Sequence, residues 1–266
     1  MTDLHVQIGS IEFSNPIMTA SGTFGYGFDV PEFVNVSQLG GIVTKSITLN
    51  PREGNPPPRI VETPSGMINS IGLANVGVDH YIEKMVPLYQ TIGTKIIMNV
   101  AGSTLDEYVN VIRKMESVSS NITGYEINVS CPNVKEGGME FGVDCTLTGE
   151  LTKSLRTLTE RLLIIKLSPN VTDIAAIAKS AEDNGADAVS AINTLVGMSI
   201  NPMTWKSNIH TVFGGLSGPA IKPIGIAAVQ KIFRAVTIPI IGMGGITNSM
   251  DVVEYMLAGS TAVQLG

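Results

Sequence analysis

The sequence predicts an α/β protein folded as a (β/α)8 barrel. Short apolar runs recur eight times along the 266 residues, with amphipathic segments between them. Such runs, without strict polar alternation, suit strands buried on both faces of a parallel sheet, and eight strand–helix alternations are typical of a barrel. The expected strands lie within residues 15–22, 40–46, 95–102, 125–131, 162–169, 188–194, 238–245 and 261–266.

The segments between these strands carry the start and stop signals of helices. Thr104 and Glu107 open residues 104–117 with the spacing of a capping box. Gly185 and Gly259 close two further helical patterns as C-terminal caps. The sequence stops directly after the eighth strand, so we expect one barrel domain over residues 1–266 that lacks the final C-terminal helix.

Composition argues against several classes of function. A formal charge of −6 gives no general attraction for nucleic acid or anionic membranes. The first residues lack the basic and apolar parts of a secretion signal, and no stretch is apolar enough to span a bilayer, so a cytoplasmic protein is expected. Two cysteines make no disulfide framework, and three scattered histidines predict no metal site.

The connections differ in length in a way that locates the site. Those that lead into a strand are tight, whereas long connections that leave strands span 47–73, 131–149 and 195–218. In a barrel, the loops after the strands form the C-terminal face, where active sites lie. Residues 52–73 are expected to carry a small hairpin whose end folds back over this face.

Two lysines lie at strand ends on this face. Lys45 and Lys166 each place an ammonium among apolar residues, and uncompensated burial of such a charge is costly. Pairing, neutralisation or an anionic ligand can satisfy such a charge, and pairing with an internal carboxylate suffices for either lysine alone. Two lysines at one face favour a ligand that carries or develops negative charge.

Asparagines end three of the strands, and a fourth lies in a loop. A single asparagine at a strand end is commonly a turn former. A ring of amides, each with donors and an acceptor, instead matches a planar ligand bearing alternating N–H and C=O groups. The four residues are Asn69, Asn99, Asn128 and Asn193.

Glycines follow the seventh strand in residues 242–247. The loops after strands seven and eight are a common phosphate site of barrels, because glycines let backbone N–H groups approach the anion. Residues 217–219, with Gly218 at their centre, offer a second close approach. The spacing differs from that of a dinucleotide fingerprint, so the position of the glycines is the stronger indication.

One of the two cysteines lies one residue past a strand end. A free cysteine is commonly an inert packed side chain, which is our interpretation of Cys145. Cys131 instead opens a long connection at the predicted active face. No histidine lies at a comparable strand end, so Cys131 is the expected base if a proton is abstracted there.

Taken together, these motifs closely resemble those of the dihydroorotate dehydrogenases. They are "KSITLNPREGNPPPR", "NSIGL", "NVSCPN", "AINT" and "GMGGI", in order between Asn15 and Gly266. The resemblance implies oxidation of (S)-dihydroorotate to orotate in pyrimidine biosynthesis, with FMN as hydride acceptor. It implies Cys131, Lys45 and Lys166 as the catalytic residues.

The same resemblance implies two sets of binding residues. FMN is expected to contact Ser21, Lys45, Ser46, Asn99, Asn128, Lys166, Ile192, Gly218, Gly244, Gly245 and Gly266. Dihydroorotate is expected to contact Lys45, Asn69, Ser70, Ile71, Gly72, Leu73, Asn128, Asn193 and Thr194.

The loop "SCPNVKEGGMEFG" looks like the class 1B branch of that family. Its NAD-linked enzymes work with a separate iron–sulfur and FAD electron-transfer subunit, which implies a homodimer of this chain flanked by two such subunits. Four alternatives stay open. They are a fumarate-linked class 1A enzyme, a pyrimidine-reducing enzyme like dihydropyrimidine dehydrogenase, an aldolase with Lys166 as Schiff-base nucleophile, and a cofactor-free binding subunit.

Overall fold

The computed structural model describes residues 3–28, 34–130 and 141–266. Eight parallel strands close a barrel, and each overlaps one of the eight predicted runs, so the predicted fold class is confirmed. The strands, in their order around the barrel, are β3 (Ile17–Thr19), β4 (Gly41–Val43), β7 (Lys95–Ala101), β8 (Ile122–Asn128), β9 (Leu162–Lys166), β10 (Ala188–Ala191), β15 (Ile240–Met243) and β16 (Ala262–Leu265), which pairs back to β3.

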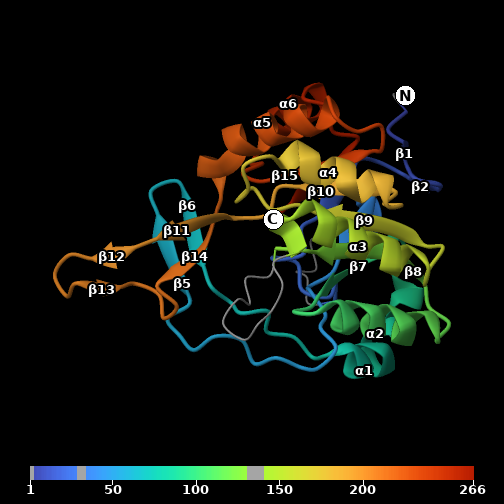
Figure 1. The fold of residues 1–266 in the computed structure, drawn as a ribbon, viewed down its shortest axis with the longest axis horizontal. Coiled ribbons are helices and arrows are strands. Elements are labelled where there is room, and N and C mark those ends of the chain that lie inside the picture. The colour runs from blue at the N-terminus through green and yellow to red at the C-terminus, as the bar shows by residue number, and fades with distance from the viewer. Residues whose placement is uncertain (1–2, 29–33, 131–140) are drawn as a thin grey trace.

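Helices cover the outside of the barrel between successive strands (Figure 1). The first, α1 (Val78–His80), continues into the π-helix η2 (Tyr81–Met85) and the 3₁₀ helix η3 (Val86–Thr91). Short 3₁₀ turns are η1 (Val36–Gln38), η5 (Phe141–Val143) and η6 (Pro219–Ile221). The longer helices are α2 (Leu105–Glu116), α3 (Cys145–Arg156), α4 (Ile174–Asp183), α5 (Lys222–Phe233) and α6 (Ser249–Leu257).

The helix ends follow the local sequence signals. The Thr104 side chain accepts from the backbone N–H of Glu107 at 3.2 Å, as predicted. The Glu107 carboxylate binds the N–H of Ser103 at 2.5 Å, so the return bond of the expected capping box falls one residue earlier. Gly185 and Gly259 follow α4 and α6 with φ of +98° and +116°, a left-handed geometry that confirms them as C-terminal caps.

The apolar core has two layers. An outer layer fills the space between the strands and the helices. An inner layer fills the barrel toward the N-terminal ends of its strands. There the hairpin of β1 (Val6–Ile8) and β2 (Ile11–Phe13) packs Ile8 and Phe13 against inward-facing strand residues. Those partners are Met18, Val43, Ile97, Leu162, Ile164, Ala188, Ile241 and Ala262.

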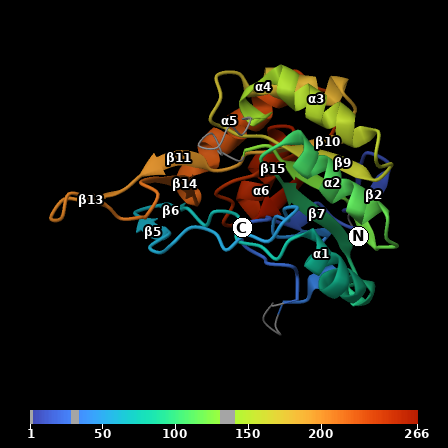
Figure 2. The same cartoon turned by 60° about the horizontal axis from the view of Figure 1, so that its bottom comes forward.

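A second sheet projects from one side of the barrel. Figures 1 and 2 show this lobe extending away from the helical ring. Four antiparallel strands form it in the order β11 (Leu195–Met198), β14 (Phe213–Ser217), β6 (Gly66–Asn69), β5 (Ile60–Thr63), and the ribbon of β12 (Ile200–Asn201) and β13 (Lys206–Ser207) lies beyond. The expected hairpin within residues 52–73 is confirmed, but residues 195–218, expected as a loop, contain four strands.

No helix in the described ranges is both long and apolar enough to cross a membrane.

Candidate functional site

The predicted site residues that the structure describes lie where the sequence places them, at the C-terminal ends of barrel strands and in the segments that follow. Cys131 lies outside the described residues. Asn99, Asn128 and Lys166 belong to β7, β8 and β9, and Ile192, Asn193 and Thr194 follow β10. The others follow β3 (Ser21), β4 (Lys45 and Ser46), β14 (Gly218), β15 (Gly244 and Gly245) and β16 (Gly266), or run from β6 (Asn69, Ser70, Ile71, Gly72 and Leu73).

The interior of the barrel changes from apolar to polar near this end. Side chains two residues apart on a strand point to the same face, so each change can be followed along one strand. On five strands an apolar residue or glycine is followed, two positions later, by a polar residue that is at most 6% exposed. The pairs are Ile97 and Asn99, Gly124 and Glu126, Ile164 and Lys166, Ala188 and Ser190, and Ala262 and Gln264.

Glu126 lies at the centre of this polar layer and is fully buried. Its Oε1 accepts from Asn99 Nδ2 at 2.7 Å, and its Oε2 accepts from Ser190 Oγ at 2.9 Å and Gln264 Nε2 at 2.5 Å. Lys166 Nζ lies 3.7 Å from Oε1. Residues of four different strands therefore converge on the one carboxylate that β8 carries.

The two lysines have different surroundings. Lys166 is paired with the internal carboxylate of Glu126 and also donates to Ser21 Oγ at 3.0 Å, so one of the expected ways to satisfy its charge is present. Lys45 is half-buried. Within the described part of the chain, no carboxylate oxygen lies within 4 Å of its ammonium. Lys45 is thus the lysine that is available to an anionic group.

The four asparagines do not form one contiguous ring. Asn193 Nδ2 donates to Asn128 Oδ1 at 3.1 Å, so these two amides lie together at the rim. Asn99 is buried one layer below, where its Oδ1 accepts from Ser46 Oγ at 2.5 Å. Asn69 lies in the lobe and donates to the Gly215 carbonyl at 3.4 Å.

The segment from β6 connects the lobe to the barrel. Ser70 Oγ accepts from Thr211 Oγ1 at 2.6 Å, which ties the start of the segment to residues that precede β14. At its other end, the Leu73 carbonyl accepts from Asn75 Nδ2 at 2.7 Å. The same amide group donates to Thr48 Oγ1 at 2.8 Å, just after β4. Residues 69–73 therefore bridge from the lobe to the strand end that carries Lys45.

The glycines after β15 and β14 bring two loops into contact. Gly245 has φ of +69°, and a Cβ there would lie 2.7 Å from the Gly218 carbonyl oxygen and 2.9 Å from the Lys222 nitrogen. Only glycine fits this approach without strain. Buried Tyr255 fixes the preceding residue by donating to the Gly244 carbonyl at 2.7 Å, and burial raises the pKa of the Tyr255 phenol.

Asp251 holds the same loop from the other side. It accepts from Lys222 Nζ at 2.6 Å, at the start of α5, and from the Thr247 backbone N–H at 2.8 Å, before α6. Lys222 and these hydrogen bonds from Thr247 keep the pKa of the Asp251 carboxyl far below its usual range. The beginnings of α5 and α6 are thereby fixed around a glycine-lined turn, a geometry that suits a phosphate.

Two other expectations from the sequence concern Cys145 and metal binding. Cys145 was expected to pack, but this is wrong: it is the first residue of α3 and is exposed. The expectation of no metal site stays a prediction. Among the described residues, no group of three or more His, Cys, Asp or Glu side chains is placed to hold a metal ion.

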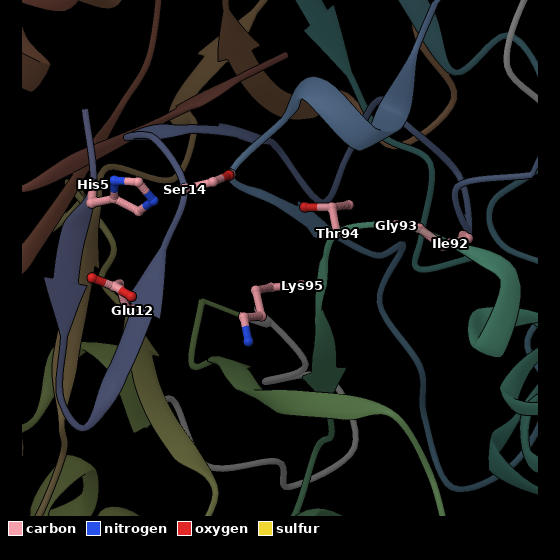
Figure 3. A pocket seen from close by; sticks show the side chains of 8 residues that line it. His5, Glu12, Ser14, Ile92, Gly93, Thr94 and Lys95 are labelled. Carbon is pink, nitrogen blue, oxygen red and sulfur yellow. The ribbon is translucent and has the colours of Figure 1, made fainter. Parts of the chain in front are cut away.

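A separate pocket lies at the opposite end of the barrel (Figure 3). His5, Glu12, Thr94 and Lys95 line it, around the N-terminal ends of β4 and β7. It is remote from the polar layer, so we place the candidate site at the C-terminal face.

Sequence reasoning missed Glu126, Ser190 and Gln264. A glutamate inside the apolar run "GYEINV", two residues before Asn128, was the available signal. The expectation that a lysine can pair with an internal carboxylate was general and named no partner.

Comparisons with known proteins identify the family of this chain. A family model described as "Dihydroorotate dehydrogenase" matches residues 3–266. The "Dihydroorotate dehydrogenase B (NAD(+)), catalytic subunit" of Bacteroides thetaiotaomicron is 50% identical over 266 residues, which are 100% of this chain and 88% of that protein. The protein of the same name from Thermoanaerobacter sp. (strain X514) is 50% identical over 264 residues, 99% of this chain and 87% of that protein.

A solved structure supports the fold alone. It is the crystal structure of DHODH from Eimeria tenella in complex with ferulenol, with a TM-score of 0.80 at 22% identity, covering 99% of this chain and 78% of that one. The family model, together with half-identical relatives along the whole chain, shows that this chain belongs to the dihydroorotate dehydrogenase family.

Proposed function

We propose that this chain is the catalytic subunit of an NAD-linked, class 1B dihydroorotate dehydrogenase. It oxidises (S)-dihydroorotate to orotate in pyrimidine biosynthesis, with FMN bound in one barrel domain over residues 1–266, and works in the cytoplasm. The single observation that carries the proposal is the 50% identity to relatives named for this activity, over the whole chain. The polar strand ends described above are consistent with it.

FMN fits the residues at the barrel mouth. The turn around Gly218, Gly244 and Gly245 offers backbone N–H groups and two helix beginnings to the phosphate. Ser21, Ser46, Asn99 and Lys166 offer hydroxyl, amide and ammonium groups to the flavin ring, as do Asn128 and Lys45 at the rim; Ile192 and Gly266 complete the set. When bound, FMN supplies the acceptor for the hydride that leaves C6 of dihydroorotate.

Substrate recognition is assigned to the half-buried rim. Lys45 has no carboxylate partner in the described chain and binds the substrate carboxylate. Asn128 and Asn193, already in mutual contact, bind the N–H and C=O edge of the pyrimidine together with Thr194. Residues 69–73 cover the substrate from the lobe side.

Cys131 is the proposed base. It takes the C5 proton of dihydroorotate while the hydride leaves C6, so that the C5=C6 double bond of orotate forms. Lys166 supplies positive charge beside the cofactor and so favours the electron-rich ring. Both roles are carried over from the family motif.

Paired cysteine variants test this assignment. Cys131→Ala is expected to keep FMN, read from its visible absorption, but to lose most steady-state oxidation of dihydroorotate. Cys145→Ala is the matched control, because Cys145 is exposed on α3, and it is expected to retain full activity. Unchanged turnover in Cys131→Ala rules out this cysteine as the base.

A partner chain is part of the proposal. The relatives are named as catalytic subunits, which implies at least one further subunit. We propose that the full complex is a homodimer of this chain flanked by two iron–sulfur and FAD subunits that pass electrons to NAD⁺. The lobe supports an interface, because its large apolar side chains face water. They include Val196, Met198, Ile200, Met203, Trp205 and Phe213, which are 42–89% exposed.

A further inference from the structure

Glu126 has contacts that the proposed mechanism leaves unused. It is fully buried, and each of its four close partners presents a proton donor to it. A carboxylate only accepts hydrogen bonds, so it fixes the orientation of every amide that meets it. The amide nitrogens of Asn99 and Gln264 must therefore face Glu126.

The orientation of Asn99 has a consequence at the mouth of the barrel. Because its Nδ2 is held by Glu126 at 2.7 Å, its Oδ1 is turned toward the Ser46 hydroxyl. Both Asn99 and Ser46 are among the residues proposed to contact the flavin. The direction in which this pair presents its donors is thus set by a residue below it.

The charge of Lys166 depends on the same residue. Its ammonium lies 3.7 Å from Glu126 and 3.0 Å from Ser21, and it is 6% exposed. Two charges at such a short distance in the protein interior interact strongly, because little water screens them. The net positive charge that Lys166 offers to a ligand is therefore reduced by Glu126.

We propose that Glu126 is a positioning residue that orients Asn99 and offsets the charge of Lys166, and that it thereby lowers the reduction potential of the bound flavin. The inference rests on the proposed function, because it takes Lys166 and Asn99 as flavin contacts. Reduction adds negative charge to the flavin, so a buried carboxylate behind Lys166 opposes it. Removing that carboxylate leaves Lys166 free to stabilise the reduced ring.

The substitution Glu126→Gln tests the proposal with little change in shape. An amide accepts at one end only, so one of Asn99 and Gln264 loses its acceptor and must turn, while the other faces a neutral oxygen in place of a charged one. We expect the reduced flavin to be favoured at least tenfold, which is a rise in the midpoint potential of about 30 mV for a two-electron couple. The potential is measured by equilibration with reference dyes, independently of turnover.

Glu116→Gln is the matched control. Glu116 also carries a network of contacts, here only partly buried, with Arg161 Nε at 3.1 Å and the hydroxyls of Tyr125 and Thr159 at 2.7 Å, but it lies at the end of α2, away from the mouth. It is expected to destabilise the protein without moving the potential. A potential that is unchanged in Glu126→Gln, or that moves equally in both variants, overturns the inference.

Two further measurements separate this inference from the proposed function. The FMN-free protein reports the positioning directly: the side-chain amide resonances of Asn99 are expected to shift in Glu126→Gln and to stay in Glu116→Gln. If Glu126→Gln does not fold, Glu126→Asp keeps the charge but shortens the reach, so Asn99 is held less well and a fall in FMN affinity is expected. Unmoved Asn99 resonances, or an unchanged affinity in Glu126→Asp, overturn the inference, whereas a wild-type protein that FMN does not bind counts against the proposed function alone.

Discussion

The contact between the loops at Gly218 and Gly245 predicts that Gly245→Ala weakens FMN binding. At φ of +69° an alanine adopts a left-handed conformation that costs an L-residue about 1–2 kcal/mol. Its Cβ also lies 2.7 Å from the Gly218 carbonyl oxygen, closer than real Cβ contacts, and that neighbour is backbone that cannot rotate away. The loop must therefore leave its position in the free protein and be forced back when phosphate binds.

The strain alone sets the expected magnitude. About 1–2 kcal/mol corresponds to a loss of FMN affinity of about 5- to 30-fold, and the steric contact adds to it. The assay is titration of FMN-free protein with FMN, followed by quenching of flavin fluorescence. Gly197→Ala is the control, because its Cβ meets Ile68 and Leu216 at ordinary contact distances of 3.4 and 3.5 Å. An FMN affinity of Gly245→Ala within twofold of the wild type refutes the phosphate assignment.

Three other predictions follow from individual contacts. Lys45→Met is expected to lower kcat/KM for dihydroorotate about 10- to 100-fold, because the charge-assisted hydrogen bond to the substrate is lost. Lys95→Met, in the pocket at the other end of the barrel, is expected to change kcat/KM little. Equal effects of the two substitutions contradict the substrate role of Lys45. Burial disfavours the charged form of Glu182 and would raise its pKa. Hydrogen bonds from Thr237, together with Lys179, outweigh this effect and lower the pKa of Glu182 from 4.5 to about 2. Glu182 therefore contributes about 1–3 kcal/mol to the free energy of unfolding above pH 4.5, and this contribution is lost as the pH falls through about 2. In denaturant unfolding, the stabilities of wild type and Glu182→Gln should differ near neutral pH and converge in acid. A difference that stays constant with pH contradicts this. Trp205→Ser is expected to weaken the proposed homodimer in analytical ultracentrifugation, and an unchanged dimer assigns the interface to another surface.

The barrel was predictable because its strands are local patterns. Each buried strand is a short apolar run, and the capping residues Thr104, Gly185 and Gly259 mark helix ends from their immediate neighbours. The proposed position of the site also rests on local information, since polar residues at strand ends and long connections point to the C-terminal face.

The lobe and the polar layer were not predictable in the same way. The lobe pairs β6 with β14, and Asn69 meets Gly215 at a distance of 146 residues along the chain, so neither partner shows its pairing locally. The role of Glu126 emerges only when β7, β9, β10 and β16 surround it. The exposure of Cys145 likewise depends on where α3 lies against the barrel.

The central claim is that this barrel transfers a hydride from dihydroorotate to its own flavin. Anaerobic mixing of the FMN-loaded protein with dihydroorotate measures that transfer directly, without any partner subunit. Bleaching of the flavin absorption by dihydroorotate, with orotate formed in equal amount and no bleaching by dihydrouracil or dihydrothymine, is the predicted result. A flavin that stays oxidised with dihydroorotate, or that is reduced equally well by dihydrouracil, contradicts the account.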